Sequence, residues 1–131
     1  MINIETFKER FSYFDKEVVV EIIDIFIEEY DDRIKNITQY IEDQNLDEFR
    51  KAIHAFKGVM SNFEEKCLAY QKIYLIHHEA AVLFDQIKEG RLLSDAELDS
   101  FSNSMKKEFA VFKPASYKML NDLKVIRPNY L

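Results

Sequence analysis

Glycine and proline are nearly absent from this chain, and their scarcity constrains the fold more than any other feature. The 131 residues include two glycines and two prolines, about 3% of the chain where average usage is about 12%. Few tight turns can form, which disfavours a sheet-rich fold. Because Gly58 and Gly90 are far apart, glycine-rich phosphate-binding loops are excluded. At this length we expect a single domain over 1–131.

Apolar residues recur at helical spacing along nearly the whole chain. The pattern predicts five helices, over 3–11, 16–43, 46–63, 67–89 and 95–125. Asp15 and the pair Ser94 and Glu97 are typical of helix starts, whereas Gly90 suits a helix end. Pro114 is expected to kink or interrupt the last helix. We therefore expect an all-α fold, an antiparallel up-down four-helix bundle with a short extra N-terminal helix.

The charge balance and the single cysteine limit the classes of partner and compartment. A net charge of −6 argues against nucleic acid. No apolar run approaches the length of a membrane span, and the first residues lack the pattern of a signal peptide. Cys67 alone provides neither a disulfide nor a cysteine-based metal site. We expect a cytoplasmic monomer without a membrane or metal partner.

His54 lies in the third predicted helix, opposite the apolar stripe of that helix. The stripe consists of Phe49, Ala52, Ile53, Phe56, Met60 and Phe63. At 100° per residue, the side chain of His54 is predicted to point toward solvent. Gly58 follows one turn later on the same face, where glycine costs about 1 kcal/mol relative to alanine. A surface glycine there lets another backbone approach closely.

Basic residues surround His54 within an otherwise acidic region. Residues 15–48 contain twelve acids and three bases, whereas 49–63 contain no acid and three bases, Arg50, Lys51 and Lys57. Cations around an exposed imidazole favour a bound anion. A histidine with a pKa near 6.5 is mostly neutral at pH 7 and nucleophilic, so His54 could accept a phosphoryl group. The alternative is an ordinary surface histidine.

The run from His54 to Phe63 resembles the signature of histidine phosphotransfer (HPt) domains. That signature is His, any residue, a hydrophobic residue, Lys and Gly, with Asn and a hydrophobic residue eight and nine places after the His. The matching residues are His54, Phe56, Lys57, Gly58, Asn62 and Phe63. The resemblance extends over about 4–124 in helix order and length. It implies that His54 accepts a phosphoryl group and passes it to or from an aspartate of a receiver domain.

The chain also departs from the family pattern. Glu64 stands where many members have glycine. The end of 67–89 resembles the phosphotransfer domain of chemotaxis-type histidine kinases, in which a His and a Glu of this helix support the phosphorylated His. His78 matches that His, but Ala81 replaces the Glu. The geometry of an antiparallel neighbour instead favours His77, since it brings 76–77 level with His54. The alternative is that His77 and His78 are both plain surface or edge residues.

The resemblance also implies partners and roles for the surrounding residues. The partners are a response-regulator receiver domain, a histidine kinase, or both, with Mg²⁺ held by the receiver. The candidate catalytic residues are His54, as the phosphorylated nucleophile, and Lys57. The phosphate and charge environment consists of Arg50, Lys51 and His77, and the docking surface of Ala55, Gly58, Ser61 and Asn62. Without an ATP-binding motif, the chain is expected to be a relay intermediate, not an enzyme, with no cofactor of its own.

Three other functions remain open at this point. A helical docking module would keep the fold without phosphotransfer, leaving His54 incidental. A stand-alone substrate domain of a chemotaxis-type kinase would be phosphorylated by a kinase acting in trans. A metal-dependent or hydrolytic enzyme would need a convergent acid–base pair, and the sequence shows none.

Overall fold

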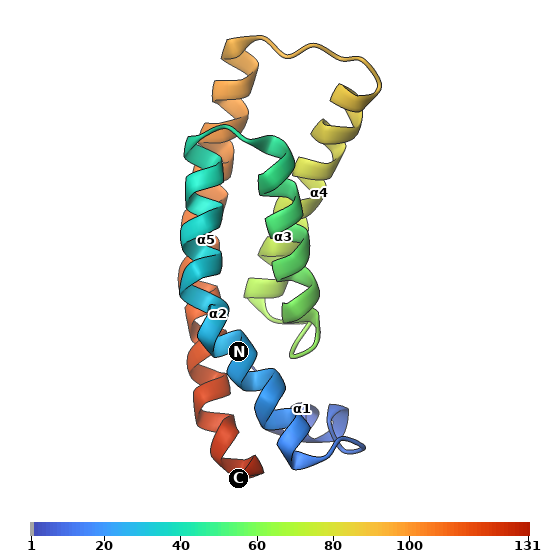
Figure 1. Ribbon diagram of the computed structural model, residues 1–131, viewed down its shortest axis with the longest axis vertical. Coiled ribbons are helices and arrows are strands. Elements are labelled where there is room, and N and C mark those ends of the chain that lie inside the picture. Colours follow the sequence, from blue (N-terminus) through green and yellow to red (C-terminus); the bar gives the residue numbers. More distant parts are fainter. Residues whose placement is uncertain (1) are drawn as a thin grey trace.

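The computed structural model describes residues 2–131, which contain helices and no strand. The helices are α1 (Ile4–Arg10), α2 (Lys16–Glu42), α3 (Leu46–Ser61), α4 (Leu68–Lys88), α5 (Asp95–Ile126) and the short 3-10 helix η1 (Arg127–Tyr130). Every end of the five predicted helices agrees with the structure to within two residues. The all-α fold class is therefore confirmed (Figure 1).

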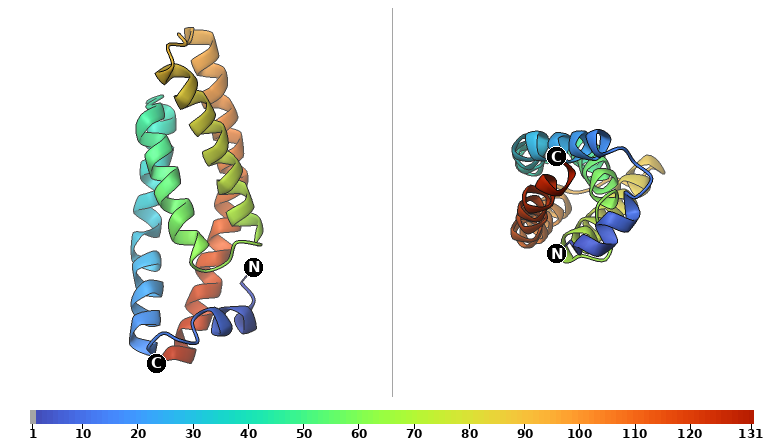
Figure 2. Two further views of the ribbon diagram at one scale, coloured as in Figure 1. Left: turned by 90° about the vertical axis from the view of Figure 1, so that its right-hand side faces the viewer. Right: turned by 90° about the horizontal axis from the view of Figure 1, so that it is seen from below.

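The four long helices lie side by side, and each contacts two of the others. Helix α2 contacts α3 and α5, and α4 contacts the same two helices. Seen from the end in Figure 2, the helices surround a shared interior, with α1 at the end where the chain terminates. Within residues 2–131, each helix is too short or too polar to serve as a membrane span.

Phenylalanines fix the rotation of α3 within this arrangement. The ring of Phe56 lies 6.1 Å from that of Phe26 on α2 and 5.5 Å from that of Phe112 on α5. Phe63, just beyond α3, lies 5.3 Å from Phe26 and 6.3 Å from Phe7 of α1. These rings are almost completely buried. Because one face of α3 is held inward in this way, the opposite face is left to solvent.

The predicted helix ends are largely as expected. Ser94 and Glu97 form a reciprocal capping box at the start of α5. Gly90, at φ 106°, donates its backbone N–H to the carbonyl of Ile87, closing the end of α4. Asp15 occupies the N-cap position of α2, but its side chain makes no capping hydrogen bond.

Helix α5 continues through Pro114, so the expected interruption is wrong. Proline removes the N–H that would bond the carbonyl of Ala110, but both residues are exposed and water can bond that carbonyl instead. A side chain adds a hydrogen bond to the backbone in this turn of α5, since the Ser116 hydroxyl donates to the carbonyl of Lys113 at 2.9 Å. The Ser116 hydroxyl is itself 2.7 Å from that of Tyr30, which ties this turn to α2.

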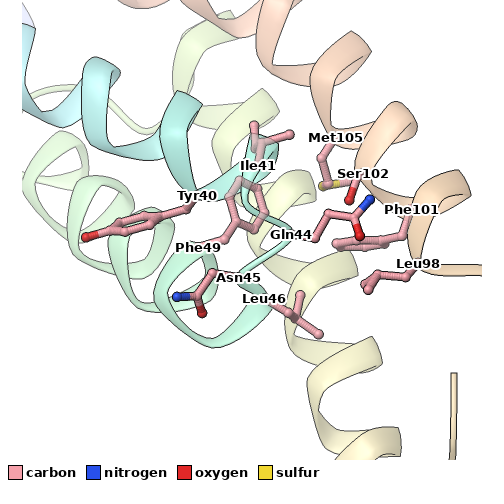
Figure 3. Close-up of a pocket in the computed structure, with 10 residues that line it drawn as sticks. All are labelled: Tyr40, Ile41, Gln44, Asn45, Leu46, Phe49, Leu98, Phe101, Ser102 and Met105. Atoms are coloured by element: carbon pink, nitrogen blue, oxygen red, sulfur yellow. The ribbon is translucent and has the colours of Figure 1, made fainter. Parts of the chain in front are cut away.

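The hairpin of α4 and α5 extends past the connection between α2 and α3 (Figure 1). For this reason Ile87 is 37% exposed and Leu98 and Phe101 are half-buried, although each continues the apolar spacing of its helix. Beside this end is a hollow of about 10 Å³, room for about one water molecule. Figure 3 shows its mainly apolar lining, with Phe49 and Met105 among the side chains. It is too small to hold a substrate.

Candidate functional site

The structure brings His54 of α3 and His77 of α4 together. Their ring centres lie 4.9 Å apart, with the ring planes at 37°. His54 is exposed, as its position on the helix predicted, and His77 is half-buried. His78 is also exposed but lies elsewhere, lining a shallow hollow with Val82 and Phe101. The neighbour of His54 is therefore His77, as the antiparallel geometry predicted, and not the residue that the chemotaxis-kinase alignment favoured.

Lys57 of α3 contacts two side chains of α4, His77 and Tyr74. Its Nζ lies 3.1 Å from Nδ1 of His77 and 5.2 Å from the centre of the Tyr74 ring. An ammonium group only donates hydrogen bonds, so Nδ1 of His77 accepts and the ring carries its proton on Nε2. Sequence reasoning missed Tyr74, although its position one turn before His77 places both on the same face of α4.

The electrostatic environment keeps His77 uncharged at neutral pH. Burial is the largest cause, and repulsion between a protonated His77 and the neighbouring basic groups, Lys57 first and then His54, Arg50 and His78, adds to it, lowering the pKa of His77 to about 4. The site thus contains a neutral imidazole that accepts from an ammonium at one nitrogen and keeps an N–H donor at the other. A neutral donor of this kind can bond an anion attached to His54 without first being protonated.

This lowered pKa predicts a pH dependence of stability. The unfolded chain protonates His77 near pH 6.5, whereas the folded chain does so only at about 4. Protons therefore favour the unfolded state between these values, and the free energy of unfolding falls as the pH drops through that window. After discounting for solvent screening, we expect a loss of about 1 kcal/mol.

Urea unfolding of His77→Gln at pH 7 and near pH 4.5 measures this contribution. The variant is expected to lose less stability on acidification than the wild type. His78→Gln, which changes an exposed histidine on the same helix, is the matched control and should follow the wild type. Equal acid sensitivity of wild type and His77→Gln would contradict the assignment.

The basic residues predicted around His54 are not all available to an anion. Arg50 lies 3.0 Å from Asp47, and its guanidinium packs 4.0 Å from the centre of the Phe84 ring. Lys51 lies 3.3 Å from Asp47 and 3.8 Å from Glu48. The hydrogen bond from Arg50 holds the pKa of Asp47 below its usual value, so this carboxylate stays charged. The predicted positive charge around His54 is thus partly neutralised, because Asp47 and Glu48 at the start of α3 form ion pairs with Arg50 and Lys51 one turn later.

Lys57 differs from these two bases in the group that it contacts. Its ammonium lies against the neutral imidazole of His77 and not against a carboxylate. Arg50 and Lys51 pair with carboxylates, whereas Lys57 contacts an uncharged side chain.

The predicted docking residues fall into two groups. Ala55, Gly58 and Asn62 are exposed. Ser61 is half-buried: its hydroxyl donates to the carbonyl of Gly58 at 2.6 Å, and its own carbonyl accepts from Arg10 at 2.8 Å. Ser61 therefore serves the local structure of the end of α3, and the exposed surface beside His54 consists of the other three.

Gly58 is unexplained by the fold itself. It lies inside a regular helix, and a Cβ added there would meet no atom within 4 Å. Glycine at such a position costs about 1 kcal/mol relative to alanine. Internal packing therefore does not require glycine at this position.

None of the family models, curated proteins or solved structures compared with this chain matches it. Across residues 2–131, no three side chains of His, Cys, Asp or Glu are grouped so that they could hold a metal ion. The function is therefore inferred from the residues and their geometry.

Proposed function

We propose that this chain is a histidine phosphocarrier of a two-component phosphorelay, an HPt-like up-down four-helix bundle with α1 as its extra N-terminal helix. One observation carries the proposal. The ring of an exposed histidine, His54, lies 4.9 Å from that of His77, which contacts the ammonium of Lys57, and the open position of Gly58 is one turn away on α3. Helix α3 thus carries a nucleophile, His54, a positive charge, Lys57, and an open position for a partner, Gly58.

The proposed reaction is transfer between the aspartyl phosphate of a receiver and His54. A neutral ring nitrogen of His54 attacks phosphorus, the N–P bond forms, and the P–O bond to the aspartate breaks. The carboxylate leaves, and the other ring nitrogen of His54 keeps its proton. Because such transfer depends on positioning and charge stabilisation, the bundle need only present His54 and exclude water when docked. The resemblance assigns Mg²⁺ to the receiver.

In this proposal, two side chains stabilise the phosphoryl group on His54. Lys57 supplies a positive charge, and Nε2–H of His77 supplies a neutral donor. The exposed surface of Ala55, Gly58 and Asn62 lets the receiver backbone approach. The chain acts as a relay intermediate, and catalysis of net chemistry is left to its partners.

Removing the charge of Lys57 is expected to slow transfer. Lys57→Met keeps the length of the side chain but loses a charge-assisted hydrogen bond, worth about 1.5–3 kcal/mol, or about 10–100-fold in rate. Lys51→Met is the matched control, because the ammonium of Lys51 already forms ion pairs with Asp47 and Glu48. Single-turnover transfer from a phosphorylated receiver measures both, and equal effects of the two variants would contradict the role of Lys57.

The proposal is tested by intact mass after incubation with phosphorylated receivers, phosphoramidate or a chemotaxis-type kinase. We expect a mass increase of one phosphoryl group that is lost in acid, as a phosphohistidine is. Loading by the kinase and by no receiver would favour the stand-alone kinase substrate. No increase with any donor would contradict phosphotransfer and favour the docking module.

A further inference from the structure

Helix α4 presents a line of apolar side chains on the outside of the molecule. Leu68, Leu75 and Val82 are 55%, 50% and 43% exposed. They are spaced seven residues apart, so they form one line of about 20 Å along the helix. Inward-facing Ile73 and Ile76 are completely buried, so α4 is apolar on two sides. A helix with a second apolar face is expected to bury that face against another surface.

The charges of the molecule indicate what covers this face. Between residues 68 and 84, Lys72 and Glu79 are the two charged residues, whereas residues 15–48 carry twelve acids. Two copies of a chain with a net charge of −6 repel each other over their acidic faces. The outer face of α4 is nearly neutral, so a second copy can approach there without that cost.

We propose that this chain forms a homodimer in which the outer faces of two α4 helices pack antiparallel, about a twofold axis at Leu75. The axis sets Leu75 against its own copy. Because residues 68 and 82 are equally far from 75, it also sets Leu68 against Val82 of the partner subunit. Each copy thereby covers the same apolar line of the other.

The charged residues of α4 are complementary in this arrangement. Lys72 and Glu79 are seven residues apart and therefore share one edge of α4. That edge faces α5, because Lys72 lies 3.6 Å from Glu108. The twofold axis brings like edges together and puts Lys72 about one residue from Glu79 of the partner subunit. Two ion pairs of this kind select the antiparallel orientation.

The dimer is independent of the proposed phosphotransfer and compatible with it. His77 and Tyr74 lie on the other edge of α4, toward α3, as their contacts with His54 and Lys57 show. The apolar line does not include them, so both His54 sites stay open on the same side of the dimer. This assembly differs from the monomer expected from composition.

Sedimentation velocity over a micromolar-to-millimolar concentration series tests the dimer. We expect the wild type to be dimeric at the upper end of the series. Leu75→Glu places two carboxylates at the axis and should raise the dissociation constant at least about a hundredfold. Ile25→Glu, a similar change at a residue of α2 that is 44% exposed, should leave it unchanged. A wild type that is monomeric throughout, or equal effects of both variants, would overturn the proposal.

A cysteine at the axis provides a second measurement that does not depend on the effect of a buried charge. Leu75→Cys brings two thiols together, so mild oxidation should yield a disulfide-linked dimer on a non-reducing gel. The native Cys67 is buried. Ile25→Cys is the control and should remain unlinked. A disulfide-linked dimer of Ile25→Cys alone, or of neither variant, would overturn the twofold arrangement. The absence of any link is also the result expected if a different protein covers the outer face of α4.

Discussion

Replacing His54 by glutamine is expected to abolish phosphoryl uptake, because the amide nitrogen of glutamine is not nucleophilic. The side chain is exposed, so the free energy of unfolding should change by less than about 0.5 kcal/mol. Intact mass after exposure to a phosphorylated receiver should therefore show an unmodified and folded protein. The loss is then chemical, since nothing structural has changed.

The other two histidines of the chain, one inside the site and one outside it, provide the comparison variants. His78→Gln should load as the wild type does. His77→Gln should load more slowly than the wild type, since it lacks the imidazole N–H donor that stabilises the phosphoryl group on His54. Uptake that persists in His54→Gln, or that is lost in His78→Gln, would contradict the assignment of His54.

Enlarging the side chain at Gly58 is expected to have opposite effects on stability and transfer. Gly58→Ala should raise the free energy of unfolding by about 1 kcal/mol, because the position is helical and a Cβ meets no neighbour. Gly58→Leu should fold equally well but slow transfer from a receiver at least about a hundredfold, because the leucine side chain displaces the docked backbone.

The choice of phosphodonor separates docking from chemistry in these variants. Uptake from phosphoramidate, which needs no docked protein, should be nearly unchanged in Gly58→Leu. Ala110→Leu, at an exposed position of α5, controls for the added side chain and should transfer at the wild-type rate. If Gly58→Leu accepts from receivers as fast as the wild type, the docking surface lies elsewhere.

The helices and the orientation of His54 could be predicted from sequence because they depend on spacing within one helix. Apolar residues such as Phe56 and Phe63 define the inward face of α3, and His54 is then directed outward by angle alone. The exposure of Ile87, where the hairpin of α4 and α5 extends past the connection between α2 and α3, could not be predicted in this way. The burial of a residue there depends on where the neighbouring helices end.

Contacts between helices were harder to predict, because they depend on the rotation and height of a second helix. The side chains of His77 and His78 point about 100° apart, so a small shift in register decides which one meets His54. The antiparallel estimate gave the correct residue, but the hydrogen bond from Lys57 to His77 was not foreseen. Within α3, the ion pair of Lys51 with Asp47 was also missed, because Asp47 and Glu48 continue the acidic region that precedes the bases along the chain.

The central claim is that His54 both receives and passes on a phosphoryl group. Phosphorus-31 NMR of the loaded chain, before and after addition of an unphosphorylated receiver with Mg²⁺, tests it most directly. The account predicts one phosphohistidine resonance, absent from His54→Gln and present in His78→Gln, that disappears as the receiver aspartate is phosphorylated. No resonance, one that persists in His54→Gln, or one that no receiver discharges would contradict the relay.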